Sequence, residues 1–249
     1  MIKKASKLKE KKYRDEYGLF IVEGEKFVDE ITNFEVEAYL LSESFVNKRK
    51  YEEKGKIFIV KDDAFKKLSD TVNPQGVLAV CKKKEYTVSN LFEKENPFIV
   101  IGERIADPGN LGTIIRTADA AGADGVVLSK NSVDIYNPKV IRSTAGSIFH
   151  IPIIVDVELP DFVATLREQN VDVFGAHLSG RFFPYDLNLR KSVALIVGNE
   201  SEGLSEKIVG VVNKLVKIPM SGKAESLNAS VACGILMYEV VRQRTNSLC

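Results

Sequence analysis

The chain has 249 residues, 45% of them hydrophobic, which is enough apolar material for one large or two modest domains. With 35 Lys and Arg against 34 Asp and Glu, its formal net charge is only +1, so the overall charge by itself does not indicate a polyanionic partner. The charged start Met1-Ile-Lys-Lys lacks the apolar core of a signal peptide, and no apolar run reaches the length of a membrane span. The widely spaced Cys81, Cys233 and Cys249 predict neither a disulfide framework nor a zinc site, so we expect a cytoplasmic protein without membrane association.

Basic residues gather at the amino terminus. Residues 1–14 hold seven Lys and Arg residues against one Glu, a local charge of +6 in a segment long enough for a helix. Such a segment can contact the phosphates of a nucleic acid. A solubilising terminal helix is an equally good interpretation.

Residues 19–80 alternate short apolar runs with amphipathic stretches, which predicts a small domain of strands and helices. The predicted strands are 19–22, 36–41, 57–60 and 77–80, and the predicted helices are 25–32 and 62–68. The chain then becomes polar and charged up to Asn96-Pro97. We therefore assign residues 1–82 to a first domain, 83–97 to a linker and 98–249 to a second domain.

The second domain repeats the alternation more strongly. Its predicted strands are 98–101, 125–128, 151–155, 171–176, 193–197 and 215–218, and its predicted helices are 110–121, 159–169, 205–212 and 226–243. Val- and Ile-rich runs separated by helices are typical of a parallel sheet covered on both faces, so the fold class is α/β. Ligands of such sheets bind beyond the carboxyl ends of the strands.

The first polar motif follows the strand 98–101. Asn110 stands where a helix is expected to begin, and Arg116 lies six residues later, just under two helical turns. A helix cap and a surface charge would explain either residue alone. Ile114, Ile115 and Ala118 surround Arg116 in sequence, however, and a guanidinium among apolar positions needs an anionic partner to offset its desolvation.

The second motif is the glycine-rich turn Gly198-Asn-Glu-Ser-Glu-Gly-Leu204, directly after the strand 193–197. Glycines allow backbone N–H groups to approach a small ligand closely. The spacing matches neither a dinucleotide-binding fingerprint nor a phosphate-binding P-loop. Glu200 is its candidate functional group, although a carboxylate that interacts with a helix dipole is the plain alternative.

The third motif is Ser226-Leu-Asn228, where Ser226 is expected to cap the last helix. The first turns of that helix carry small residues, which permit close approach of a ligand or another backbone; they are Ala229, Ser230, Ala232 and Gly234. Three loops thus predict one active site. The two histidines, His150 and His177, lack metal-ligand spacing, and no metal is expected.

These three motifs, in this order and at these distances, resemble those of the SpoU (TrmH-type) branch of the SPOUT RNA methyltransferases over residues 98–243. The segments Gly18-Leu-Phe-Ile-Val-Glu-Gly24 and Asn73-Pro-Gln-Gly-Val-Leu-Ala-Val80 resemble the substrate-binding domain of ribosomal RNA members. The resemblance implies a small, ribosomal-protein-like α/β RNA-binding domain. A SPOUT α/β-knot domain, with a parallel sheet and a carboxyl-terminal trefoil knot, would follow it.

The same resemblance implies S-adenosylmethionine-dependent methylation of a ribose 2′-hydroxyl, in 23S ribosomal RNA, by a homodimer. It assigns catalytic roles to Asn110, Arg116, Glu200, Ser226 and Asn228. It assigns cofactor contacts to Ala176, His177, Leu178, Gly198, Ile218, Ser226 and Leu227. Because a guanidinium stays protonated in proteins, we interpret Arg116 as an electrostatic clamp on the forming alkoxide and the adjacent phosphate.

Two other functions compete with this one. A non-catalytic RNA-binding or ribosome-assembly protein on the same fold would have no need for the complete set of five polar residues. A nicotinamide-dependent enzyme conflicts with the absence of the dinucleotide fingerprint.

Overall fold

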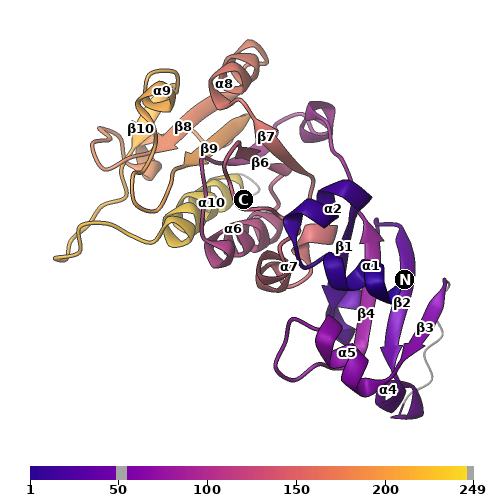
Figure 1. Cartoon of the computed structure of the whole chain (residues 1–249). Helices are drawn as coiled ribbons and strands as arrows, with labels where there is room; N and C mark the ends of the chain where they lie inside the picture. Colours follow the sequence, from indigo (N-terminus) through magenta and orange to yellow (C-terminus); the bar gives the residue numbers. More distant parts are fainter. Residues whose placement is uncertain (49–54, 246–249) are drawn as a thin grey trace. The chain divides into compact units, whose positions relative to one another are not determined.

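The computed structural model describes residues 1–48 and 55–245 (Figure 1). The chain divides into two compact units. Unit 1 comprises Met1–Lys84 together with Asp134–His150, and unit 2 comprises Glu85–Val133 together with Ile151–Cys249. Cys249 lies outside the described residues, and no helix within them is long and apolar enough to cross a membrane.

Unit 1 is built on a mixed sheet of four strands. These are β1 (Leu19–Glu23), β2 (Val36–Ser42), β3 (Ile57–Val60) and β4 (Val77–Lys82), arranged in the order β1-β4-β2-β3. β4 runs antiparallel to both of its neighbours, whereas β2 and β3 are parallel. All four strands fall on the predicted apolar runs.

The basic amino-terminal segment forms two short helices, α1 (Ile2–Lys7) and α2 (Lys11–Tyr17), which ends at Gly18 in the left-handed conformation. The further helices among residues 1–84 are α3 (Glu25–Asp29), α4 (Glu43–Lys48) and α5 (Asp62–Leu68). Ala5 and Leu8 pack with Phe65 and with sheet residues such as Leu40 in one core. The helix at 43–48 was not predicted, and the one predicted at 25–32 is shorter.

A distant segment completes unit 1. Residues 134–150 form α7 (Pro138–Thr144) and a short 3₁₀ helix at 147–149. Tyr136 packs against Phe20 at 4.4 Å between ring centroids, and Phe149 packs edge-on against Phe34 at 5.4 Å. The second face of the small sheet is therefore covered with the help of residues that follow it by more than fifty positions in the sequence.

A buried ion pair joins this segment to the amino-terminal helices. The Arg14 side chain is 3% exposed, and its Nε and Nη2 donate to Asp134 Oδ2 at 2.8 and 2.7 Å. Its Nη1 donates to the backbone oxygens of Leu8 and Lys9, both at 2.8 Å. One guanidinium thus satisfies the carbonyls between α1 and α2 and binds the carboxylate of residue 134.

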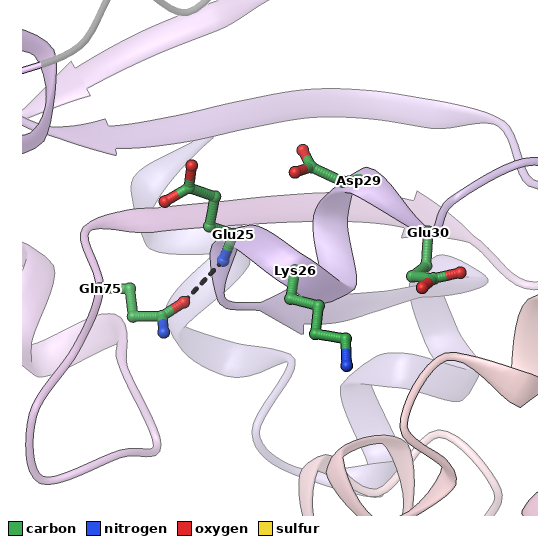
Figure 2. Close-up of a pocket in the computed structure, with 5 residues that line it drawn as sticks. All are labelled: Glu25, Lys26, Asp29, Glu30 and Gln75. Carbon is green, nitrogen blue, oxygen red and sulfur yellow. Dashed lines mark hydrogen bonds between the residues drawn. The ribbon is translucent and has the colours of Figure 1, made fainter.

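The loop 69–76 is held from two sides. The Glu23 carboxylate accepts hydrogen bonds from the Ser69 hydroxyl, from the Asp70 N–H at 2.9 Å and from Thr71 Oγ1 at 2.7 Å. Figure 2 shows the second contact, in which the Glu25 N–H donates to Gln75 Oε1 at 2.8 Å. The two segments whose sequences resemble a substrate-binding domain are themselves joined by the pairing of β1 with β4, and these bonds fix the loop that precedes β4.

Unit 2 contains a six-stranded sheet, and all of its pairings are parallel, as predicted. Its strands are β5 (Phe98–Gly102), β6 (Gly125–Ser129), β7 (Ile153–Val157), β8 (Asp172–Ala176), β9 (Val193–Val197) and β10 (Lys214–Val216). They lie in the order β10-β8-β9-β5-β6-β7. The chain leads from β5 toward one edge of the sheet and from β9 toward the other, so the order of the strands reverses between these two neighbours. The loops that follow two such strands commonly hold a ligand.

Helices cover both faces of this sheet (Figure 1). α8 (Leu159–Glu168) and α9 (Glu206–Val209) share a core with Ile99, Ile101 and Ile196. Side chains alternate along a strand, so the residues between these point to the opposite face. There α6 (Pro108–Ala120) and α10 (Ala229–Thr245) contact each other side by side.

The ion pair of Arg14 gives the first prediction. Arg14→Ala deprives the largely covered Asp134 carboxylate of its cation and the Leu8 and Lys9 carbonyls of their donor, and the loss of unfolding free energy should be about 3–5 kcal/mol. Urea titration monitored by circular dichroism measures it. Lys11→Ala, which removes the exposed pair with Asp15, should cost about 0.5 kcal/mol or less. Equal effects of the two substitutions would contradict the structural role of Arg14.

Candidate active site

The loops after β5 and β9 are fastened to each other where the order of strands reverses. Buried Glu103 accepts hydrogen bonds from the Ser205 N–H at 2.8 Å and from its hydroxyl at 2.6 Å. Asn199 Nδ2 donates to the backbone oxygen of Arg104 at 2.9 Å. Arg104 itself has a positive φ of 53° and pairs with Glu202 at 2.6 Å. Three side-chain links therefore fix the predicted glycine-rich turn on the end of β5.

Within that turn the chain folds back on itself. Asn199 and Gly203 exchange backbone hydrogen bonds of 3.1 and 2.9 Å, and Asn199 Oδ1 accepts the N–H groups of Ser201 and Glu202. A Cβ on Gly198 would lie 2.2 Å from the carbonyl carbon of Gly203. No side chain fits there, so the turn requires glycine at position 198.

The helix that carries the first motif begins two residues before the predicted start. Asp107 caps α6 by accepting the Asn110 N–H at 2.8 Å, and Pro108 occupies the first helical position. The expectation that Asn110 begins the helix is therefore wrong. Because Asp107 does the capping, the side-chain amide of Asn110 is available for other contacts.

Asn110, Glu200 and Asn228 form a hydrogen-bonded chain. Asn110 Nδ2 donates to Glu200 Oε1 at 3.0 Å, and Asn228 Nδ2 donates to Asn110 Oδ1 at 2.9 Å. Glu200 also faces the backbone N–H groups of Ala106 and Asp107 at 3.5 and 3.4 Å. One residue from each of the three predicted motifs thus meets at a single point.

Asn228 also organises the start of α10. Its Oδ1 accepts the Ser230 N–H at 2.9 Å and the Ser230 hydroxyl at 2.7 Å. The helix begins at Ala229, so Ser226 lies three residues before it and does not cap it, in contrast to the sequence prediction. Ser226 instead lines a neighbouring pocket.

This pocket has a volume of about 290 Å³ and lies against the glycine-rich turn. It brings together all seven residues predicted to contact a cofactor, namely Ala176, His177, Leu178, Gly198, Ile218, Ser226 and Leu227. Met220 adds a further apolar side chain, while Glu200 and Glu202 add carboxylates. Such a mixture suits a ligand with a flat apolar part and a positive charge.

The surroundings of Arg116 differ from those that the sequence predicts. It lies on α6, but its side chain is exposed and makes no hydrogen bond or ion pair with any residue that the structure describes. The inference that apolar surroundings desolvate Arg116 is therefore wrong within one chain. The apolar neighbours Ile114 and Ile115 face the core instead, since both are fully buried.

The two cysteines within the described residues, Cys81 and Cys233, take no part in this site. Burial alone raises the pKa of the Cys233 thiol on α10 to about 12, and it raises the pKa of the Cys81 thiol in unit 1 to the same value. At neutral pH both remain protonated and inaccessible. Neither is a candidate nucleophile.

Sequence reasoning missed four residues that shape the site, namely Glu103, Arg104, Asp107 and Asn199. Asp107 was detectable, because Asp followed by Pro is a standard start of a helix. The other three act through loop-to-loop hydrogen bonds that span about a hundred positions. No local pattern predicts such bonds.

The family of the chain follows from comparison with known proteins. Residues 97–238 match the SpoU rRNA Methylase family, and residues 1–79 match the MRM3-like substrate binding domain. The chain belongs to the SpoU rRNA methylase family, which confirms the resemblance drawn from its motifs. SpoU methyltransferases use S-adenosylmethionine as their methyl donor.

Individual relatives are similar along their whole length. The chain is 35% identical to the 23S rRNA (guanosine(2553)-2′-O)-methyltransferase RlmP of Bacillus subtilis over 241 residues, 96% of this chain and 95% of that protein. The SpoU methyltransferase AviRb of Streptomyces viridochromogenes, solved with AdoMet, superposes with a TM-score of 0.88 at 27% identity, covering 98% of this chain and 97% of that one. An AdoMet-bound rRNA methyltransferase from Sinorhizobium meliloti gives 0.86 at 32% identity, with coverages of 97% and 94%.

Proposed function

We propose that this protein transfers the methyl group of S-adenosylmethionine to a ribose 2′-hydroxyl of 23S ribosomal RNA, with release of S-adenosylhomocysteine and of the hydroxyl proton. The observation that carries the proposal is the hydrogen-bonded chain of Asn110, Glu200 and Asn228 beside the pocket of about 290 Å³. The named relatives that act on 23S rRNA support the substrate class. We propose the cytoplasm as the compartment, because ribosomal RNA is the expected substrate.

The residues of the pocket fit this cofactor. Leu178, Ile218 and Leu227 offer apolar contacts for an adenine ring, and the glycine at position 198 lets the backbone approach it. Glu200 and Glu202 add carboxylates to the lining, and although Glu202 pairs with Arg104, the Glu200 carboxylate has no cationic partner among the described residues and would favour a positively charged ligand. The cofactor supplies an electrophilic methyl group. The chain's own residues orient the acceptor and stabilise the charge that develops on it.

In this proposal Glu200 fixes the amide of Asn110, which in turn is held by Asn228. A rigid amide at this position can orient the ribose hydroxyl, and orientation supplies much of the acceleration in a transfer reaction. Arg116 carries a permanent positive charge and no partner among the described side chains, so it is available to a phosphate and a forming alkoxide. Ser226 lies on the pocket wall, where it can contact both cofactor and substrate.

We further propose that the enzyme is a homodimer. Val231, Ile235 and Tyr238 lie on one face of α10 and are 51, 42 and 52% exposed. An apolar stripe of this kind beside the site suits a second copy of the chain. Pairing through α10 would bring Arg116 of one chain to the pocket of the other, which accounts for its exposure here. We also propose that the carboxyl-terminal part of the chain forms the trefoil knot that the resemblance to the family implies.

RNA capture is proposed for the predicted first domain, residues 1–82, and methyl transfer for residues 98–249, with 83–97 as linker. Several amino-terminal lysines are already engaged within unit 1: Lys4 pairs with Glu37, and Lys9 donates to the backbone oxygens of residues 67 and 69. Lys7 and Lys12 instead lie over the Tyr13 ring at 4.8 and 5.7 Å. These two exposed ammonium groups donate to no carboxylate or carbonyl among the described residues and are candidate phosphate ligands.

The activity itself is tested with unmethylated 23S ribosomal RNA and S-adenosylmethionine labelled on its methyl group. Mass spectrometry of nuclease fragments should find the label on a single ribose. RNA binding without any label transfer would favour the non-catalytic RNA-binding protein instead.

Gly198→Ala tests the assignment of the pocket. The added methyl would collide with the backbone at residue 203 and open the turn, so the Kd for S-adenosylmethionine should rise at least about tenfold. Isothermal titration calorimetry measures this. Gly222→Ala is the matched control, since its Cβ would meet nothing within 4 Å. An unchanged Kd for S-adenosylmethionine in the Gly198 variant would contradict the assignment of this pocket as the cofactor site.

Arg116→Ala should lower the rate of transfer by about 10²–10³-fold, because it removes one charged donor to the forming alkoxide. Cofactor affinity should stay near that of the wild type, since Arg116 is absent from the pocket lining. Single-turnover assays and calorimetry measure the two quantities. Arg167→Ala, on α8, controls for removal of an exposed arginine. Weakened cofactor binding would contradict the assigned role.

Mixed dimers test whether the site is shared between chains. Arg116→Ala and Asn228→Ala should each be strongly impaired alone, whereas a heterodimer of the two should recover part of the activity, because one of its two sites is then intact. Affinity tags on each chain allow purification of the heterodimer. Absence of recovery in verified heterodimers would mean that each site is complete within one chain.

The double variant Lys7→Gln, Lys12→Gln should bind ribosomal RNA more weakly and with a shallower salt dependence. The slope of log K against log salt should fall by roughly one for each phosphate that the variant no longer neutralises. Filter binding across a salt series measures the slope. The control is the double variant Lys82→Gln, Lys130→Gln, which removes two positive charges from lysines that are paired with carboxylates and should change the slope less. Equal slopes for both double variants would exclude the two amino-terminal lysines as phosphate ligands.

A further inference from the structure

The segment between β8 and β9 carries aromatic rings that the proposed chemistry does not use. Phe182 is 38% exposed and Tyr185 is 59% exposed. The Tyr185 ring is stacked on that of Phe183, with centroids 5.3 Å apart and an interplanar angle of 22°. We call Phe182, Phe183 and Tyr185 the aromatic surface. Exposed rings of this size are costly in water and mark an interaction site.

The backbone below the aromatic surface is firmly held. The His177 N–H donates to the backbone oxygen of Val216 at 2.9 Å, and the Lys217 N–H donates to that of Phe182 at 2.8 Å. A Cβ on Gly180 would lie 2.7 Å from the carbonyl carbon of Val216, so only glycine allows this approach to β10. The Phe183 N–H donates to Asp186 Oδ2 at 3.0 Å. The rings are thus presented on a preorganised turn.

Positive charge surrounds the aromatic surface. Lys214 Nζ lies 4.5 Å from the centroid of the Phe182 ring, and Arg181 is exposed next to it in sequence. Lys217 follows on the same strand edge. Asp186 is the acidic residue of the segment 177–186, and its carboxylate is occupied by the Phe183 N–H. Rings and cations together match a nucleic acid, which offers flat bases and phosphates.

The segment begins in the wall of the pocket. His177 and Leu178 line the pocket, and so do Val216 and Ile218 on either side of the residue that bonds Phe182. A nucleotide bound on the aromatic surface would therefore lie within a few residues of the proposed methyl donor. A ribose cannot be methylated until the strand that carries it is fixed beside that donor.

We propose that the aromatic surface binds unpaired bases of the RNA substrate, which stack on Tyr185 and Phe182 while Lys214 and Arg181 contact phosphates. This inference rests on the proposed RNA methyltransferase function and adds a second RNA contact, within unit 2. It commits to single-stranded RNA, because stacking requires bases that are free of a partner strand.

The chain contains no tryptophan, which allows a direct optical test. Tyr185→Trp places a single indole on the aromatic surface, and addition of a short single-stranded RNA should quench its fluorescence as a base stacks on it. Val155→Trp is the matched control, because Val155 is 43% exposed on β7, at the opposite edge of the same sheet. Equal responses of the two probes, or no response of either, would overturn the proposal.

Affinity provides the second test. Phe182→Ala with Tyr185→Ala should raise the Kd for single-stranded RNA about tenfold, whereas Phe182→Tyr with Tyr185→Phe should keep it. Cofactor affinity and sedimentation should match the wild type in both. Unchanged RNA affinity of the alanine variant, or a change in its oligomeric state, would overturn the proposal. The wild-type methylation assay separates this failure from that of the enzyme function, because the wild type would still label ribosomal RNA.

Discussion

The fastening of the turn 198–204 to the end of β5 is the constraint on which the site depends. Glu103 binds Ser205, and Asn199 binds the carbonyl of Arg104, so the turn cannot move away from α6. Only in that position does Glu200 reach Asn110, and only then does Asn110 present its oxygen to Asn228. A carboxylate buried at the base of the turn therefore determines the geometry of polar groups that it never touches.

Sequence patterns predicted the strands of both units and the parallel sheet, because buried strands require unbroken apolar runs. They also named Asn110, Glu200 and Asn228, which the fold brings together. The boundaries near Asn110 and Ser226 were wrong, because the side chains of Asp107 and Asn228, not those of Asn110 and Ser226, accept the first backbone N–H groups of α6 and α10. The environment of Arg116 was not predictable from its neighbours, since those apolar residues point to the core while the arginine points outward.

The charges of unit 1 also could not be interpreted fully from the sequence. A charge count gives +6 for residues 1–14, but it does not distinguish lysines that bind a carboxylate or a carbonyl from those that remain available. Arg14 contributes to that count and is nevertheless an interior residue. The local charge therefore overstates the number of Lys and Arg side chains that can bind RNA. The available ones are identified only after the internal partners of each side chain are known.

The pairing of Arg14 with Asp134 also has a consequence for biosynthesis. The two residues are 120 positions apart, and chains are translated from the amino terminus at roughly 5–20 residues per second. Arg14 therefore waits roughly 6–24 s for its counterion during synthesis, with the strands of unit 1 already made. A domain that begins the chain cannot finish folding until the middle of the chain has left the ribosome, so its assembly is timed by the progress of translation.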